Sequence, residues 1–127
     1  MSTFHDFNVN KYLLNALEDL EITTPTPIQQ ESFSVIKSGR NVIGIAQTGT
    51  GKTLAFSLPS LTDLKYSEQK NPRILILVPT RELVLQVVEN LKAYTKYMTV
   101  RIEGVYGGTN INTQKMAVAQ GVDVLVA

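Results

Sequence analysis

The chain has 127 residues, of which 43% are apolar and 18% are charged, and this composition predicts a soluble globular domain with a real hydrophobic core. A formal net charge of only +1 argues against a protein that holds nucleic acid by bulk electrostatics, so any such contact must come from a few well-placed groups. The absence of cysteine excludes a disulfide framework and a thiolate zinc site, and it favours a reducing, cytoplasmic compartment.

The first third of the chain predicts two helices. Thr26 is placed to cap the second one, with Pro27 at its first position and Gly39 just beyond its end. The first helix is indicated by leucines that recur at helical spacing, at Leu13, Leu14, Leu17 and Leu20.

From residue 41 the pattern alternates between strands and helices. A strand at 42–45 is followed by a glycine-rich turn and by a helix that begins near Lys52 and is disturbed at Pro59. The aliphatic run at 74–78 predicts a parallel strand that is buried on both faces. The remaining elements are expected as a helix at 80–94, a strand at 100–105, a helix at 111–119 ended by Gly121, and a strand at 122–126. This alternation predicts an α/β fold, a parallel sheet flanked by helices in three layers, whose ligand lies at the carboxyl ends of the strands.

Nothing in the sequence predicts export or a membrane anchor. The N-terminus has neither a basic segment nor an apolar run, and the longest aliphatic stretch, at 74–78, is too short to cross a bilayer.

The strongest signal is the glycine-rich segment at 46–53, placed between a predicted strand and a predicted helix as a phosphate-binding loop requires. Gly49 and Gly51 let the backbone N–H groups turn toward phosphate oxygens. Lys52 would reach the β and γ phosphates, and the Thr53 hydroxyl would ligate Mg²⁺, so both are catalytic candidates. Ala46 departs from the general pattern, and the alternative is a glycine-rich turn without a ligand. The nucleotide-binding candidates in this loop are Ala46, Gln47, Thr48, Gly49, Thr50, Gly51, Lys52 and Thr53.

The sequence Pro-Thr-Pro-Ile-Gln at 25–29, upstream of this loop, resembles the DEAD-box RNA helicases, and in that family an alanine at position 46 is expected. The resemblance implies that Pro25, Thr26 and Gln29 belong to the adenine-reading Q motif and that Phe4 stacks on the base. A carboxamide supplies one donor and one acceptor, which match the N6 and N7 edge of adenine.

Blander interpretations of the Q-motif residues are a packed N-terminal segment for Phe4 and Phe7 and a solvated position for Gln29. Their joint placement before the phosphate loop favours ATP binding. Glu21 stands where the family usually has glycine, which leaves the turn geometry there open.

Two further segments resemble family motifs that contact RNA. The sequence Pro-Thr-Arg-Glu-Leu at 79–83 is similar to motif Ia, and the pair at 107–108 is similar to the GG motif. Thr80 and Arg81 can contact phosphate, and the glycines permit close backbone approach, so sequence-independent RNA binding is implied. The blander interpretations are a helix cap at Thr80 and a simple turn at 107–108. The RNA-binding candidates are Pro79, Thr80, Arg81, Gly107 and Gly108, whereas Lys92, Lys96 and Arg101 are expected on a solvated face.

The resemblance covers the whole chain and implies that residues 1–127 are the N-terminal part of the first RecA-like domain of an ATP-dependent RNA helicase, a P-loop NTPase fold. In the family, Thr-Pro-Gly-Arg, Asp-Glu-Ala-Asp and Ser-Ala-Thr follow, together with a second RecA-like domain. We therefore expect the full-length protein to couple ATP hydrolysis to RNA unwinding and the 127-residue chain alone to be inactive or nearly so. Two alternatives stay open: another phosphate-loop ATPase such as a DNA helicase, which residues 25–29 disfavour, and a naturally short ATP- or RNA-binding module.

Overall fold

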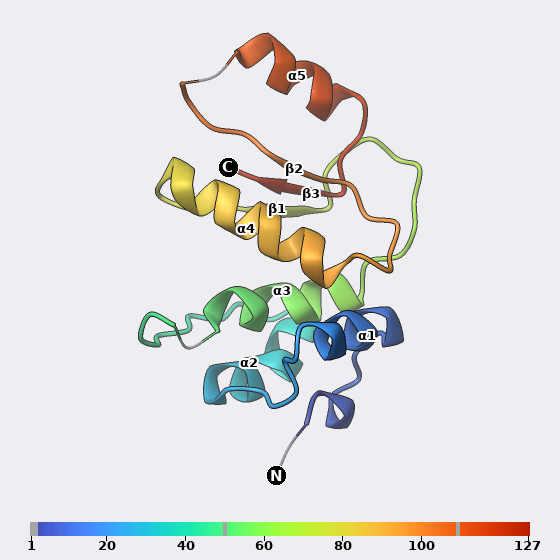
Figure 1. The fold of residues 1–127 in the computed structure, drawn as a ribbon, viewed down its shortest axis with the longest axis vertical. Coiled ribbons are helices and arrows are strands. Elements are labelled where there is room, and N and C mark those ends of the chain that lie inside the picture. Colours follow the sequence, from blue (N-terminus) through green and yellow to red (C-terminus); the bar gives the residue numbers. More distant parts are fainter. Residues whose placement is uncertain (1–2, 50, 109) are drawn as a thin grey trace. The chain divides into compact units, whose positions relative to one another are not determined.

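The computed structural model describes residues 3–49, 51–108 and 110–127. The chain divides into two compact units, Met1–Lys65 and Tyr66–Ala127, which we call the N-terminal unit and the C-terminal unit. Each is described by itself, with the elements labelled as in Figure 1.

The N-terminal unit is helical in its described residues. Its elements are the short 3-10 helix η1 (Phe4–Asp6) and the helices α1 (Lys11–Asp19), α2 (Pro27–Lys37) and α3 (Lys52–Thr62). The leucine spacing that predicted α1 reflects its buried face, because Leu13 and Leu17 are almost completely buried. The predicted boundaries of α2 are confirmed as well: Thr26 is its N-cap, Pro27 occupies the first turn, and Gly39 adopts a left-handed φ of +86° just past the end.

Helix α3 begins at Lys52 as predicted, but it continues through Pro59 to Thr62. The expected disturbance does not end the helix. Leu58 and Leu61, on either side of Pro59, are each 1% exposed, so burial of these apolar side chains outweighs the one backbone hydrogen bond that proline removes.

The predicted strand at 42–45 is wrong. Residues 41–47 form no regular element, and Ile43 and Ile45 are 92% and 91% exposed. An apolar β-branched run becomes a strand only when a neighbouring strand accepts its backbone hydrogen bonds. Within the described part of the chain the sheet contains only β1, β2 and β3, and none of them pairs with this segment.

The C-terminal unit contains the parallel sheet that the alternating pattern predicted. Its strands are β1 (Ile74–Ile76), β2 (Ile102–Gly104) and β3 (Val124–Val126), in the order β1-β3-β2, with Ile74 and Ile102 both opposite Val124. Helices α4 (Arg81–Tyr94) and α5 (Ile111–Ala119) make the crossovers from β1 to β2 and from β2 to β3, as parallel strands require. In Figure 1 α4 and α5 lie on opposite sides of the three strands, so the predicted α/β fold with a flanked parallel sheet is confirmed.

The strand predicted at 74–78 is present as β1, but the prediction that both of its faces are buried is wrong. Ile76 is buried, whereas Leu75 and Leu77 are largely exposed. Successive side chains of a strand point to opposite faces, so one face of β1 is covered and the other is not.

The amino ends of the three strands meet at a buried carboxylate. Asp123, just before β3, accepts hydrogen bonds from Arg73 Nη2 at 2.9 Å and from the Arg101 backbone N–H at 2.9 Å, and Arg101 Nη2 lies 3.0 Å from its Oδ1. Burial by itself would raise the Asp123 pKa, but the hydrogen bonds from Arg101 and Arg73 outweigh it and lower the pKa to about 2. The expectation that Arg101 lies on a solvated face is therefore wrong, because its guanidinium binds this carboxylate.

None of the helices in the described ranges is long and apolar enough to span a membrane.

Candidate functional site

The glycine-rich loop of the N-terminal unit has the backbone that its sequence predicts. Gly49 and Gly51 have left-handed φ values of +83° and +82°, a conformation that costs glycine little. Gly51 is the N-cap of α3, and it provides no side chain to bond the first N–H groups of the helix. These donors at the positive end of α3 are therefore available to an anion.

The Lys52 side chain folds back onto the start of the glycine-rich loop. Its Nζ donates to the backbone carbonyl of Ala46 at 2.6 Å, so the ammonium lies against the loop that precedes it. A phosphate oxygen could replace that carbonyl as a stronger, charged acceptor.

The first turn of α3 also holds the candidate metal ligand, Thr53, which is half-buried. The described residues contain no group of three acidic, histidine or cysteine side chains that could hold a metal ion. Mg²⁺ commonly uses one or two protein oxygens together with phosphate oxygens and water, and the single Thr53 hydroxyl fits that pattern.

Gln29 connects the start of α2 to the phosphate loop. Its side chain is only 5% exposed, which excludes the solvated position. Oε1 accepts from the Thr26 N–H at 2.9 Å, and Nε2 donates to the Gly51 carbonyl at 3.1 Å. The structure thus brings together the two segments that the sequence places 22 residues apart.

Polar side-chain atoms of Gln29 and Thr26 surround Gly51. A Cβ at Gly51 would collide with Gln29 Nε2 and would lie 3.5 Å from Thr26 Oγ1, so any other residue there would displace the Gln29 amide. Thr26 Oγ1 is buried and faces the Gln29 backbone N–H in a capping box, but it makes no hydrogen bond of good geometry among the described residues. A buried hydroxyl oxygen without a good hydrogen bond is costly, and it is a group that a ligand could satisfy.

The aromatic residues of the N-terminal segment form a row that ends on α2. Phe4 is 2% exposed and meets Phe7 edge-on with ring centroids 6.0 Å apart. Phe7 in turn stacks on Phe33 of α2 at 4.8 Å. Phe4 also lines a small cavity with Leu14 and Leu17 of the α1 region. The packing interpretation of Phe4 and Phe7 therefore describes this conformation, and a base could stack on Phe4 only after its ring face is uncovered.

The other predicted nucleotide-binding residues differ in exposure. Pro25 is buried and its carbonyl accepts from Gln30 Nε2 at 3.0 Å, whereas Gln47 and Thr48 are exposed. Thr50 lies outside the described residues. Glu21, at the position where a glycine was expected, has a left-handed φ of +59°, so the turn keeps that geometry.

In the C-terminal unit the predicted RNA-binding residues lie at the carboxyl ends of β1 and β2. Thr80 is the N-cap of α4, and its hydroxyl accepts from the Leu83 N–H at 3.2 Å, so the capping role is confirmed.

The Arg81 side chain lies beside the glycine turn. Its guanidinium lies over the Tyr106 ring, 5.0 Å from the ring centroid. Gly108, with φ +84°, would place a Cβ 3.6 Å from Arg81 Nη1. Pro79 adjoins this cap and Gly107 this turn, so the two predicted segments meet.

Two residues of this region, Tyr106 and Gln114, were not predicted from the sequence. Gln114 of α5 accepts from the Tyr106 N–H through Oε1 at 3.1 Å and donates to the Tyr106 carbonyl through Nε2 at 2.8 Å. A single glutamine within a helix gives no sequence signal, because its partner is a backbone group rather than another side chain.

Comparisons with known proteins agree with this arrangement. A sequence profile described as DEAD/DEAH box helicase matches residues 26–127. The ATP-dependent RNA helicase DeaD of Haemophilus influenzae is 42% identical over 125 residues, which cover 98% of this chain and 20% of that protein. The protein of the same name from Escherichia coli K12 is 44% identical over 126 residues with the same coverage. This chain therefore spans about a fifth of the length of these relatives.

Two solved structures share the fold. The crystal structure of the RNA helicase Prp28 from Chaetomium thermophilum bound to ADP is 33% identical with a TM-score of 0.83, over 94% of this chain and 30% of that one. A DEAD box protein from Methanococcus jannaschii is 28% identical with a TM-score of 0.88, over 98% of this chain and 34% of that one.

Proposed function

The chain belongs to the DEAD/DEAH box helicase family, and from this premise we propose that it is the ATP-binding part of an ATP-dependent RNA helicase that unwinds RNA duplexes. The observation that carries the proposal is the Gln29 amide, which joins the start of α2 to the carbonyl of Gly51 in the phosphate loop. One side chain thereby touches both the segment assigned to the base and the segment assigned to the phosphates.

The residues of the N-terminal unit fit ATP. The backbone N–H groups around Gly49 and Gly51 and the Lys52 ammonium would hold phosphates, while Gln29 would hydrogen-bond the adenine edge. Each end of the Gln29 amide makes one internal hydrogen bond, at Oε1 and at Nε2, which leaves a second lone pair and a second N–H to meet the adenine edge. Thr26 Oγ1 is a nearby polar group that makes no hydrogen bond of good geometry among the described residues.

Thr53 is the proposed protein ligand of Mg²⁺. When bound, the ion would neutralise charge on the phosphate oxygens. Lys52 would add a second positive charge at the same phosphates. The acidic and arginine groups that hydrolysis also requires are assigned to the family's later motifs and to a second RecA-like domain, so residues 1–127 alone are proposed to be inactive or nearly so.

In the C-terminal unit, Pro79, Thr80, Arg81, Gly107 and Gly108 are proposed to contact the RNA backbone. The support is the meeting of the α4 N-terminus with the glycine turn, where Arg81 lies next to Gly108. Groups of this kind bind phosphate and sugar without reading bases, which makes sequence-independent binding the expected mode.

Residues 1–127 are proposed to form the N-terminal part of the first RecA-like domain, with a Q motif, a Walker A loop, motif Ia and a GG motif. A cytoplasmic location is proposed from the absence of cysteine in the sequence.

The full-length protein tests this function directly. Wild type should hydrolyse ATP faster when RNA is added and should separate a short RNA duplex, whereas Lys52→Ala should lose roughly 100-fold in hydrolysis. Lys37→Ala is the matched control, because Lys37 lies at the end of α2 away from Gln29 and forms a surface ion pair with Asp63 at 3.9 Å. Wild type without RNA-stimulated hydrolysis, or Lys52→Ala with normal hydrolysis, would contradict the proposal.

A further inference from the structure

Arg81 is held in place by an aromatic ring. Its side chain is exposed and long, so without a support it would sample many rotamers. The guanidinium instead lies 5.0 Å from the Tyr106 ring centroid, within the range of a cation–π contact. The same guanidinium faces Gly108, the second glycine of the turn.

The position of the Tyr106 ring depends on its backbone, and that backbone lies just beyond the sheet. The Val105 N–H donates to the Val126 carbonyl at 2.8 Å, which is the last bond between the β2 segment and β3. At the next residue, the N–H and C=O of Tyr106 both bond to the Gln114 amide, at 3.1 and 2.8 Å. Gln114 thus continues the backbone pairing by one residue with a side chain in place of a strand.

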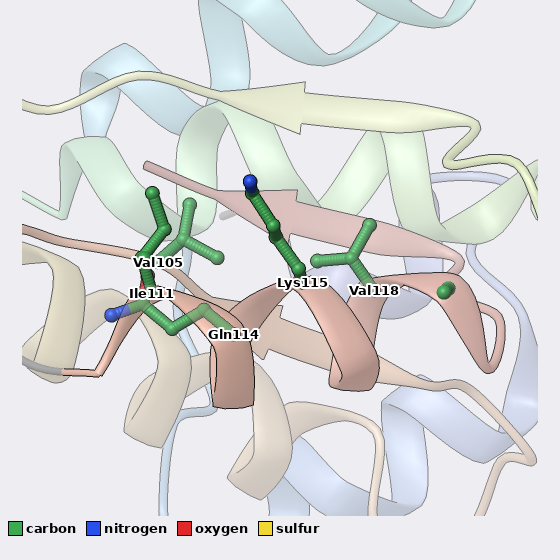
Figure 2. A pocket seen from close by; sticks show the side chains of 6 residues that line it. Val105, Ile111, Gln114, Lys115 and Val118 are labelled. Carbon is green, nitrogen blue, oxygen red and sulfur yellow. The ribbon is translucent and has the colours of Figure 1, made fainter.

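Figure 2 shows Gln114 on α5 beside Val105, where it also lines a cavity of about 440 Å³. A primary amide that meets both groups of one residue fixes that residue more strictly than a single hydrogen bond does. The chain of contacts therefore runs from α5 through Gln114 to the Tyr106 backbone, and from the Tyr106 ring to Arg81.

We propose that Gln114 and Tyr106 are positioning residues for the RNA backbone: Gln114 fixes the Tyr106 backbone, and the Tyr106 ring holds Arg81 beside the glycine turn to meet a phosphate. The inference rests on the proposed function, because it needs Arg81 to contact RNA. It adds a role for two residues outside the motifs found in the sequence.

The test measures binding of a labelled single-stranded RNA of mixed sequence to the full-length protein, by fluorescence anisotropy at several salt concentrations. Arg81→Ala should weaken binding about tenfold, as expected for loss of a charge-assisted contact. Gln114→Ala should weaken it about fivefold and reduce the slope of log affinity against log salt concentration by roughly one. Gln120→Ala, an exposed glutamine at the end of the same helix, should bind RNA like wild type.

A double-mutant cycle separates positioning from general damage. In an Arg81→Ala background, Gln114→Ala should cause no further loss, since its effect passes through Arg81. Tyr106→Phe keeps the ring and should bind RNA normally, whereas Tyr106→Leu should weaken binding as much as Gln114→Ala does. The KM for ATP should stay unchanged in every variant.

The outcomes distinguish the two proposals. If Arg81→Ala binds RNA like wild type, the proposed RNA site fails and the inference fails with it. If Arg81→Ala is weak but Gln114→Ala and Tyr106→Leu bind normally, or add their full effects to Arg81→Ala, only the inference fails. If Gln114→Ala does not fold, Tyr106→Leu still decides, because it leaves the backbone groups that Gln114 binds in place.

Discussion

In the N-terminal unit the amide of Gln29 joins two separate backbone segments, whereas in the C-terminal unit the amide of Gln114 pairs with the backbone of one residue. The phosphate loop follows a segment that forms no strand, so its connection to α2 through Gln29 is a principal restraint. The Gly107-Gly108 turn follows a paired strand, and Gln114 only extends that order. The difference predicts that the glycine-rich loop at 46–53 reorganises more easily when a ligand binds than the Gly107-Gly108 turn does.

Substitution at Gly51 gives the largest expected loss of stability. Gly51→Ala places a Cβ against the Gln29 amide at a left-handed φ, and we expect about 2–3 kcal/mol less unfolding free energy in urea denaturation. Gly39→Ala is the matched control, because it has the same left-handed φ but no atom within 4 Å, and it should cost about 1 kcal/mol. Equal losses for the two variants would show that the Gln29 contact does not restrain the loop.

The unfolding free energy of the C-terminal unit is predicted to fall in acid, because protonation of Asp123 removes its hydrogen bonds to Arg73 and Arg101 as a charged acceptor. The folded-state pKa of about 2 lies below the ordinary value of 3.8, so the unfolded chain takes up the proton first as the pH falls. The stabilisation, about 2 kcal/mol, is fully present above about pH 5 and is lost progressively as the pH falls through the folded pKa toward about pH 1.

Asp123→Asn is the variant that isolates this carboxylate. It should be less stable than wild type at pH 7 by about the same 2 kcal/mol, and in urea denaturation the difference should shrink steadily below about pH 5 and approach zero only as the pH falls below 2. A constant difference between them across this range would contradict the assigned ion pairs.

The smallest expected effect concerns the turn before α2. Glu21 has a left-handed φ of +59°, so Glu21→Gly should relieve strain and raise the unfolding free energy by about 0.5 kcal/mol, after the added freedom of the unfolded chain is counted. Glu31→Gly, within α2, should instead lower it by about 1 kcal/mol. Thermal unfolding of the two variants would show whether their effects have opposite signs, and a loss at Glu21→Gly would contradict the strain.

Local signals in the sequence predicted the helices well. Thr26, Pro27 and Gly39 specify the ends of α2 through capping and backbone preference, and Thr80 specifies the start of α4. The phosphate-loop glycines were also predictable, because left-handed φ values restrict the residue type.

Features that depend on distant partners were not predictable. Residues 42–45 have the composition of a strand, but the described residues supply no neighbour for it. Arg101 has the sequence signature of a solvated residue, yet Asp123 binds it from 22 positions away. Gln114 binds backbone, which leaves no pattern in the side chains.

The most direct test of the account is the preference for ATP over GTP, measured by titrating the full-length protein with fluorescent forms of both nucleotides. Wild type should prefer ATP, and Gln29→Ala should lose roughly 10- to 100-fold in that preference. Gln30→Ala is the matched control, since the neighbouring amide donates to the Pro25 carbonyl and not to Gly51. The ratio of ATP affinity to GTP affinity is taken within each variant, so a loss that affects both nucleotides equally cancels. A Gln29→Ala protein that keeps the wild-type ratio would contradict the proposal that this amide reads the base.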